Sequence, residues 1–247
     1  MNTSWDNVHN WYNQLVGLKG HYYHQHVIFP HLLKHLNLKK NISVLDLGCG
    51  QGVLARILPK NVKYLGIDLS SNLIKFANSH KQPNQEFIIS DISKPLPITD
   101  KLFDVITIIL AIQDLENPKD VFFNAYKHLK DNGKLFIIIN HPCFRIPRQT
   151  SWDIDTKQNL QYRRINRYLT PMTIPINTTP GQKKAIEVNH HHHSLSEYSQ
   201  FLSQTGFSID LLEEWISDKQ SYGKTGKREN KARKEIPLFL CIIASKN

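Results

Sequence analysis

The chain lacks any apolar run near the roughly 18–20 residues that a membrane-spanning helix needs. It has three cysteines in 247 residues, and their spacing fits neither a disulfide framework nor a zinc knuckle. Residues 1–15 are polar and aromatic, without the basic segment and apolar core of a signal peptide. We therefore expect a cytoplasmic protein with no membrane span and no metal site.

Acidic residues are also scarce: the chain has 21 Asp and Glu but 31 Lys and Arg, which gives a formal net charge of +10. Such an excess permits nucleic-acid binding. The basic residues are scattered, however, except for Arg163 and Arg164 with Arg167 and the run at 219–235, and no RNA-binding module is recognisable. The run at 219–235 has seven Lys or Arg in seventeen residues and few apolar ones, which predicts a mobile solvated loop. Nucleic acid is therefore the less favoured partner.

The most informative segment that is present is VLDLGCGQG at 44–52. A short buried strand carries Asp46 and leads through a glycine-rich turn into a helical run at 53–58. Glycines in such a turn let the backbone bend sharply and approach a ligand. The next strand, at 63–68, ends in Asp68, where a carboxylate can accept hydrogen bonds from two ribose hydroxyls. The pattern predicts a nucleoside-cofactor site.

The glycine spacing indicates which nucleoside is bound. The turn has Gly48-x-Gly50-x-Gly52 and not the GxGxxG of dinucleotide sites. Asp46 would repel a phosphate but suits an ammonium group. This combination resembles motif I of the class I S-adenosylmethionine (SAM)-dependent methyltransferases. The resemblance implies that the turn cradles the amino-acid end of SAM and that Asp68 holds the ribose. A tight turn without a ligand is the alternative for the glycines alone.

Apolar runs and helical segments alternate along the chain, as a doubly wound parallel sheet requires. We expect the α/β, Rossmann-like seven-stranded sheet of class I methyltransferases, whose final strand is antiparallel, with an N-terminal helical cover and an insert after strand 5. Strands are expected at 43–47, 63–68, 86–90, 104–110, 134–140, 207–215 and 237–245. Helices are expected at 53–58, 70–80, 118–133 with Gly133 as its C-cap, and 194–206.

The chain is expected to form a single methyltransferase domain without internal repeats. Its parts are an N-terminal helical cover (1–40), a SAM-binding core (41–140), an insert (141–193), and the last helix with strands 6 and 7 (194–247). The insert is far longer than an ordinary loop, which predicts a lid or a substrate-recognition element over the mouth of the SAM pocket.

The resemblance implies cofactor contacts after several strands. Asp91 and Ile92 follow strand 3, where family members use an acidic residue on the adenine amino group. Residues 110–118 follow strand 4 and correspond to the segment that lines the methionine portion. A cap or turn role is the alternative for Asp91 and Gln113. The expected cofactor-binding residues are Tyr23, Asp46, Gly48, Cys49, Gly50, Gly52, Asp68, Leu69, Asp91, Ile92, Leu110 and Gln113.

Methyl transfer needs mainly alignment and exclusion of water, and it needs a general base only when the acceptor must lose a proton. The candidate bases are His141, at the end of strand 5, and one histidine of the run at 190–193, for which we choose His193. A hydrogen-bonded histidine that holds the insert is the alternative for His141. A metal site in the run is not expected, because consecutive side chains point in different directions.

Acceptor-binding residues are expected in the insert and in the cover: Tyr12, Arg145 and Arg163. Guanidinium groups bind carboxylate or phosphate through paired hydrogen bonds, so an anionic acceptor is one hypothesis. A second is that these arginines only tie the insert to its own aspartates.

Three segments together resemble the bacterial small-molecule methyltransferases of the ubiquinone-biosynthesis-like type: WYNQLVGLKGHYYH at 11–24, HPCFR at 141–145, and the histidine-containing approach to the last helix. The resemblance implies SAM as cofactor, S-adenosylhomocysteine (SAH) as product and a small-molecule acceptor. The rival hypotheses are an RNA methyltransferase and a SAM-binding regulator without catalysis. The acceptor's identity and the oligomeric state cannot be read from the sequence.

Overall fold

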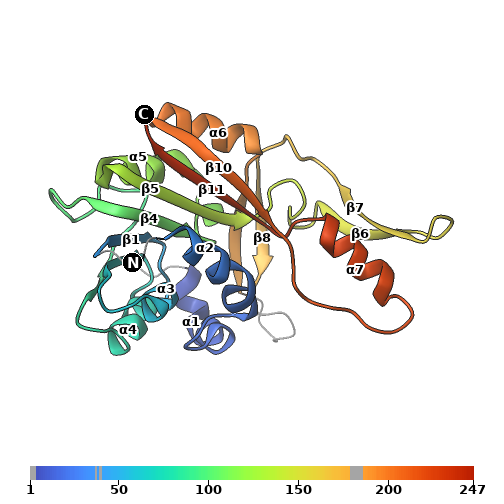
Figure 1. Ribbon diagram of the computed structural model, residues 1–247, viewed down its shortest axis with the longest axis horizontal. Coiled ribbons are helices and arrows are strands. Elements are labelled where there is room, and N and C mark those ends of the chain that lie inside the picture. Colours follow the sequence, from blue (N-terminus) through green and yellow to red (C-terminus); the bar gives the residue numbers. More distant parts are fainter. Residues whose placement is uncertain (1–3, 37, 39–40, 179–185) are drawn as a thin grey trace.

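The computed structural model describes residues 4–36, 38, 41–178 and 186–247. Parts of the expected cover (1–3, 37, 39–40) and of the expected insert (179–185) lie outside the described residues. A seven-stranded sheet in the order β10-β11-β5-β4-β1-β2-β3 forms the centre of the molecule (Figure 1). Its strands are β1 Ser43–Leu47, β2 Lys63–Asp68, β3 Gln85–Ile89, β4 Phe103–Ile109, β5 Leu129–Asn140, β10 Phe207–Trp215 and β11 Phe239–Lys246.

Strand direction confirms the predicted fold class. Strands β1 to β5 pair in parallel, whereas β11 is antiparallel to both of its neighbours, β5 and β10. The described helical segments are α1 Ser4–Val16, η1 His24–Ile28, α2 Phe29–His35, α3 Val53–Ile57, α4 Ser71–Ser79, η2 Ile112–Asp114, α5 Pro118–His128, α6 Leu195–Gln204 and α7 Gly226–Glu235. No helix within the described ranges is long and apolar enough to cross a membrane.

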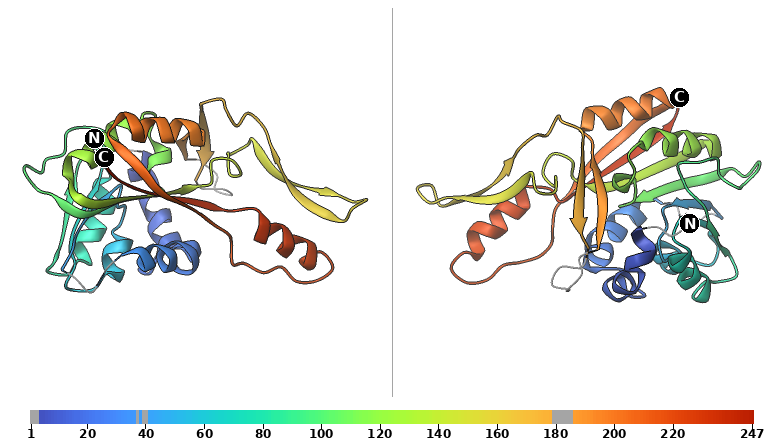
Figure 2. Two further views of the ribbon diagram at one scale, coloured as in Figure 1. Left: turned by 45° about the horizontal axis from the view of Figure 1, so that its top comes forward. Right: turned by 180° about the vertical axis from the view of Figure 1, so that it is seen from behind.

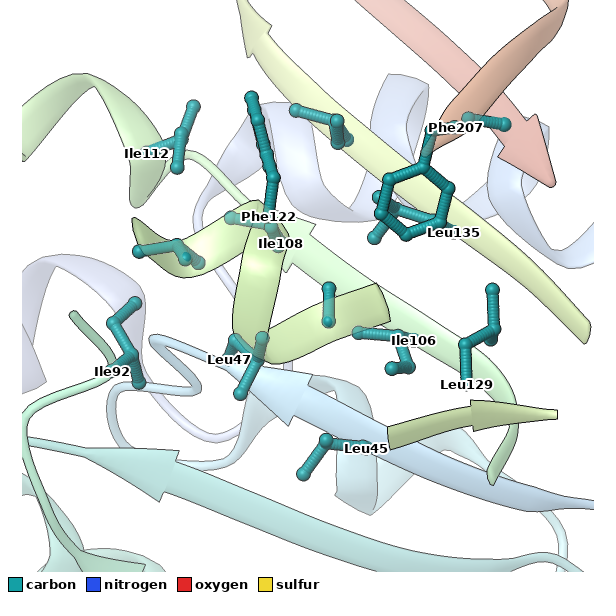
Figure 3. Packing of buried hydrophobic residues seen from close by; sticks show 14 of the residues in the cluster. Leu45, Leu47, Ile92, Ile106, Ile108, Ile112, Phe122, Leu129, Leu135 and Phe207 are labelled. Carbon is teal, nitrogen blue, oxygen red and sulfur yellow. The ribbon is translucent and has the colours of Figure 1, made fainter. Parts of the chain in front are cut away.

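The inner strands bury both of their faces, because alternate residues enter two separate apolar layers. Leu45 and Leu47 of β1 pack in one layer with Phe122 of α5 (Figure 3), whereas Val44 packs in the other layer with Leu54 of α3. The same alternation continues along β4 and β5. This two-sided core fixes the sheet, and its carboxyl edge carries the turns that form the candidate site.

The predicted end of the helix at 118–133 is wrong. Helix α5 ends at His128, and Gly133 lies inside β5 instead of capping the helix. Leu129 is fully buried and pairs with Phe103 of β4. Burial of this leucine and its strand pairing therefore begin β5 five residues earlier than the apolar run at 134–140 indicates.

The prediction of a solvated loop throughout 219–235 is also wrong, because its second half forms α7. Arg233 lies one turn after Glu229, with 3.4 Å between the Arg Nη2 and a carboxylate oxygen. Ala232 is buried, and the Asn230 side chain hydrogen-bonds both the N–H and the carbonyl of Ser221. Lys, Arg, Glu and Ala are good helix formers, so a few packing contacts order this charged segment.

The insert contains two hairpins that the sequence patterns did not predict. The first consists of β6 Thr150–Asp155 and β7 Leu160–Ile165, and the second of β8 Met172–Asn177 and β9 Glu187–His192. The first hairpin and α7 contact each other and project from the body as an arm (Figure 2). The second hairpin packs against η2 and α1, at the carboxyl edge of the sheet.

Candidate functional site

The glycine turn after β1 needs glycine for two separate reasons. Gly48, Gly50 and Gly52 have φ angles of +76°, +54° and +75°, in the left-handed region that favours glycine. A Cβ on Gly48 would lie only 2.4 Å from the Cβ of Ala111. The segment after β4 can therefore approach the turn closely only because this position is glycine.

Asp68 closes the turn from the end of β2. One of its carboxylate oxygens accepts a hydrogen bond from the Gly50 N–H at 2.8 Å, and the other accepts one from the Ser70 N–H at 2.9 Å. Burial raises the pKa of this carboxyl, although both hydrogen bonds act in the opposite direction. Because each oxygen can accept more than one hydrogen bond, the carboxylate retains acceptor capacity. The next residue, Leu69, presents an exposed apolar side chain.

Asp46 lies behind the turn, within the sheet. Its two oxygens accept hydrogen bonds from the Tyr64 hydroxyl at 2.6 Å and from the Thr107 hydroxyl at 2.7 Å. The residue is 3% exposed, and burial raises its pKa to about 6. These contacts join β1 to both of its neighbouring strands. The expected contact of Asp46 with an ammonium group stays a prediction.

Helix α1 covers the turn with two aromatic residues. The hydroxyl of Tyr12 lies 3.4 Å from the position that a Cβ on Gly50 would take. The Trp5 ring packs edge-on against Tyr12, with 5.4 Å between ring centroids, and its side chain hydrogen-bonds Asp114. Asp6 anchors the helix, because it accepts a 2.6 Å hydrogen bond from the side chain of the α4 N-cap.

Three carboxyl groups, those of Asp46, Asp68 and Asp114, act electrostatically on half-buried Tyr12 and raise its pKa beyond the effect of burial. None of the three forms an ion pair with Lys or Arg in the part of the chain that the structure describes. Burial, together with the charge of Asp68, raises the pKa of Asp114 to about 8, although the hydrogen bond from Trp5 acts to lower it. This end of the site is therefore rich in acid groups and suits a positively charged ligand.

The expected residues after β3 support the turn. The Asp91 carboxylate accepts hydrogen bonds from the Ser93 N–H at 2.9 Å and from the Ser93 hydroxyl at 2.7 Å, as in a local turn. Ile92 is buried, and its Cδ1 lies 3.7 Å from the Cβ position of Gly48. Ile92 thus backs the glycine turn, and the contact of Asp91 with adenine stays a prediction.

The segment after β4 connects two strand ends. Leu110 has a φ of +54°, which is unusual for leucine, and its N–H donates to the Ile138 carbonyl at 2.8 Å. Gln113 is buried, and its side-chain oxygen accepts a hydrogen bond from the Asn140 N–H at 3.2 Å. Cys49, in the glycine turn, is buried, and burial raises the pKa of its thiol. Its side chain fills space in the turn.

His141 is held from both sides. Its Nε2 lies 2.7 Å from a carboxylate oxygen of Glu214, and its Nδ1 accepts a hydrogen bond from the Cys143 N–H at 3.2 Å. The residue is 1% exposed, and burial lowers its pKa. Both ring nitrogens are therefore occupied by the fold, which favours the alternative that His141 holds the start of the insert.

The histidine run lies on and just after β9. His190 and His192 are buried on one face of the strand, and the Nε2 of His192 lies 2.7 Å from the Tyr168 carbonyl oxygen. His193 is also buried, and within the described chain neither of its ring nitrogens has a hydrogen-bond partner. Its Nδ1 lies 3.5 Å from a carboxylate oxygen of Glu197. The Nε2 of His193 thus has no partner within the described chain, while its Nδ1 faces Glu197.

Arg145 and Arg163 meet at Trp152 of β6. Their guanidinium carbons lie 5.5 Å and 5.3 Å from the centroid of the same indole ring. Tyr23, expected at the cofactor, lies on this side: it acts electrostatically on Arg145, and its hydroxyl hydrogen-bonds Ser217 at 3.1 Å. The structure therefore places Tyr23 with the arginines, while Tyr12, expected at the acceptor, covers the glycine turn.

Sequence reasoning missed three side chains that build the site. Trp5 and Trp152 contact expected site residues, and Asp6 fixes α1 to the loop after β2. No local pattern identifies them, because their partners lie 7 to 109 residues away in the sequence. The sequence offers only weak signals for the two tryptophans: Trp5 lies in the predicted cover, and Trp152 lies between Arg145 and Arg163.

Comparisons with known proteins agree with this geometry. A family described as a methyltransferase domain matches residues 38–199. The ubiquinone biosynthesis O-methyltransferase of Glaesserella parasuis is 31% identical over 124 residues, which are 45% of this chain and 52% of that protein. The enzyme of the same name from Coxiella burnetii is 30% identical over 138 residues, 53% of this chain and 57% of that protein. This chain thus spans about half the length of the curated relatives it matches.

Among solved structures, an S-adenosylmethionine-dependent methyltransferase from Mesorhizobium loti is similar in fold, with a TM-score of 0.69 and 24% identity. The similarity covers 88% of this chain and 97% of that chain. The similarity in fold therefore extends over most of this chain.

Proposed function

Because the chain belongs to this methyltransferase family, we propose that it transfers a methyl group from SAM to a small-molecule acceptor. The observation that carries the proposal is the group of three carboxyls beside the glycine turn. Asp46, Asp68 and Asp114 have no basic counter-ion among the described residues, and SAM carries both an ammonium and a sulfonium charge. A small-molecule acceptor is supported by the names of the relatives, which are ubiquinone biosynthesis enzymes.

The residues around the turn fit the cofactor. A Cβ at Gly50 would contact the Tyr12 hydroxyl, so glycine leaves the gap between the turn and α1 open. We propose that Asp68 accepts hydrogen bonds from the ribose, that Leu69 and Ile92 contact the adenine, and that the Tyr12 ring faces the sulfonium. The bound cofactor supplies a methyl group on an already activated carbon.

Protein residues then align the acceptor and exclude water. Helix α1 and the hairpin β8–β9 lie over the carboxyl edge of the sheet and serve as the cover. We propose His193 as the base that takes a proton where the acceptor must lose one, because its ring is buried and free of hydrogen bonds within the described chain. His141 is then a positioning residue that fixes the first turn of the insert, which contains Arg145.

The test is methyl transfer from SAM labelled in its methyl group. The purified protein is incubated with a low-mass metabolite fraction and, separately, with total RNA from the same cells. We expect label in a low-mass product and none in RNA, and less label with the Asp68→Ala variant at SAM concentrations that do not saturate it. Label in RNA would contradict the small-molecule assignment. Tight SAH binding without transfer to either fraction would indicate a regulator instead of an enzyme.

A further inference from the structure

We propose that Arg145 and Arg163, both placed on Trp152, bind a carboxylate or phosphate group of the methyl acceptor. The inference rests on the proposed function, because it assigns a substrate class to the same site. It makes the acceptor an anion and places the anionic group on the insert, away from the glycine turn.

Neither arginine has a counter-ion among the described residues. Their guanidinium carbons lie 5.5 Å and 5.3 Å from one indole centroid, and the charge of Arg163 acts on Arg145. No Asp or Glu oxygen lies within 4 Å of either guanidinium in the described part of the chain. Burial and the charge of Arg163 lower the pKa of Arg145 to about 10, a value at which it remains protonated at neutral pH. Two uncompensated charges at this place favour an anion from outside the chain.

The hydrogen bonds differ between the two side chains. Arg163 is fixed by neutral groups, because its Nε donates to the Phe144 carbonyl at 2.8 Å and its Nη2 to the Thr150 hydroxyl at 2.7 Å. The Nε of Arg145 is buried and has no partner within the described chain. The Arg145 guanidinium thus keeps a donor without a partner, as a group that binds a carboxylate or phosphate requires.

The pair lies at the correct edge of the sheet. Arg145 is five residues beyond the end of β5, and its N–H donates to the His141 carbonyl at 2.8 Å. Burial and the charge of Arg145 lower the pKa of His141. Tyr23 of the cover acts to raise the pKa of Arg145. The Lys219 ammonium adds a third positive charge, 4.9 Å from the centroid of the Tyr23 ring. The site thus has an acidic end at the glycine turn and a basic end at the insert.

A purely structural role for the arginines is the competing explanation. Stacking of guanidinium groups on an indole stabilises a hairpin by itself. That role gives no reason for a buried Nε without a partner within the described chain. It also predicts that loss of Arg145 changes stability without changing the affinity for anions.

The experiment uses the full chain saturated with SAH and titrated with benzoate, inorganic phosphate and neutral benzamide at constant ionic strength, with calorimetry as the readout. Arg145→Gln removes the charge, and Arg145→Lys keeps the charge but loses the paired donors. Arg164→Gln is the matched control, because Arg164 is the next residue on β7, points to the opposite face of the hairpin and donates to the Ser151 hydroxyl at 3.3 Å.

We expect the wild type and the control to bind at least one of the two anions and not benzamide. Arg145→Gln should weaken anion binding by about 10-fold or more, the usual cost of losing a charged hydrogen-bond pair. The anion affinity of Arg145→Lys should lie between those of the wild type and Arg145→Gln. Unchanged anion affinity in Arg145→Gln, or no anion binding by the wild type at tens of millimolar, would overturn the proposal.

SAH affinity separates this inference from the proposed function. Arg145→Gln should bind SAH as the wild type does. If SAH affinity falls instead, Arg145 serves the carboxylate of the cofactor and the acceptor assignment is wrong. Failure of the wild type to bind SAH would contradict the proposed function itself. Circular dichroism shows whether Arg145→Gln folds. If it does not, the anion affinities of Arg145→Lys and Arg164→Gln are compared instead, and equal affinities would overturn the proposal.

Discussion

Asp68 and Asp114 give one end of the site its acidic character. Both carboxyls are raised in pKa by burial and lie with Asp46 around Tyr12, whereas the arginines gather on the insert. Burial without a counter-ion favours the neutral form of a carboxyl, and a positively charged ligand beside it favours the ionised form. The two ends of the site therefore favour ligands of opposite charge.

Asp68→Ala should weaken SAH binding by about 1–3 kcal/mol, because the ribose hydroxyls lose a charged acceptor. Calorimetry measures the change. The matched control is Asp155→Ala, since Asp155 also accepts two backbone N–H bonds, from Lys157 and Gln158, but lies in the arm. Equal SAH affinities in the two folded variants would contradict the role of Asp68.

Asp114 should make SAM binding depend on pH. A positively charged ligand beside this carboxyl favours its ionised form, so binding releases a proton. SAM affinity should rise as pH increases through the neutral range, and should level off above the free-state pKa of about 8. The neutral thioether of SAH should show a weaker rise. Calorimetry of both ligands across this range measures the difference.

Asp114→Asn serves as the test of that linkage, because the amide has nearly the same shape and does not titrate. The pH dependence of SAM binding should flatten in this variant. A profile identical to that of the wild type would show that another group is responsible.

At the level of elements, the cover is built from segments that are distant in the sequence. Helix α1 contacts α4 and β9, and β9 also contacts η2. Helix α6 begins directly after His193, with a capping box in which Ser194 and Glu197 bond each other's backbone N–H. The helix start thus fixes the end of β9 and, with it, the position of the candidate base.

Ser194→Ala should destabilise the protein by about 1 kcal/mol, the typical cost of losing an N-cap. Urea denaturation gives the free energy of unfolding. Ser199→Ala, an exposed change within the same helix, is the control and should have little effect. An equal loss in both variants would show that the cap makes no specific contribution.

The sequence predicted the elements whose pattern is local. Sequence patterns identify the continuous apolar runs of β4 and β5 and the glycine turn of 48–52. The burial and the backbone angles of these segments depend on neighbouring residues. The hairpins β6–β7 and β8–β9 were missed, since their short strands lie outside the two core clusters and have no continuous buried apolar run. Helix α7 was missed because its high charge and scarcity of apolar residues indicated a solvated loop, whereas its good helix formers and a few contacts order it as a helix.

The candidate site was predictable to a similar degree. Asp68 and the three glycines lie where motif spacing places them. The hydroxyls that bind Asp46 come from two other strands, and Trp5 reaches Asp114 across more than a hundred residues. Such long-range contacts depend on packing, which sequence spacing does not encode.

For the whole molecule, the positive charge is concentrated in the arm and its connections. Residues 146–169 and 216–236 contain twelve Lys and Arg against five Asp and Glu, and thus carry most of the net charge of +10. The arm projects away from the sheet (Figure 2). Weak, salt-sensitive attraction to polyanions follows from this distribution.

We expect no tight RNA complex at physiological salt, because acidic residues are interspersed with the basic ones and Glu229 pairs with Arg233. Any RNA binding should weaken steeply and linearly on a log–log plot against salt. Fluorescence anisotropy with a labelled RNA measures it. A sub-micromolar complex at physiological salt, together with methyl incorporation into RNA, would favour the RNA methyltransferase instead.

The central claim is that the glycine turn, Asp68 and the cover of α1 form a site for SAM and not for a dinucleotide. Calorimetric titration of the full chain with SAM, SAH and NAD tests it most directly. We predict saturable binding of SAM and SAH at one site per chain and no heat from NAD. Binding of NAD without a response to either sulfur nucleoside would contradict the account.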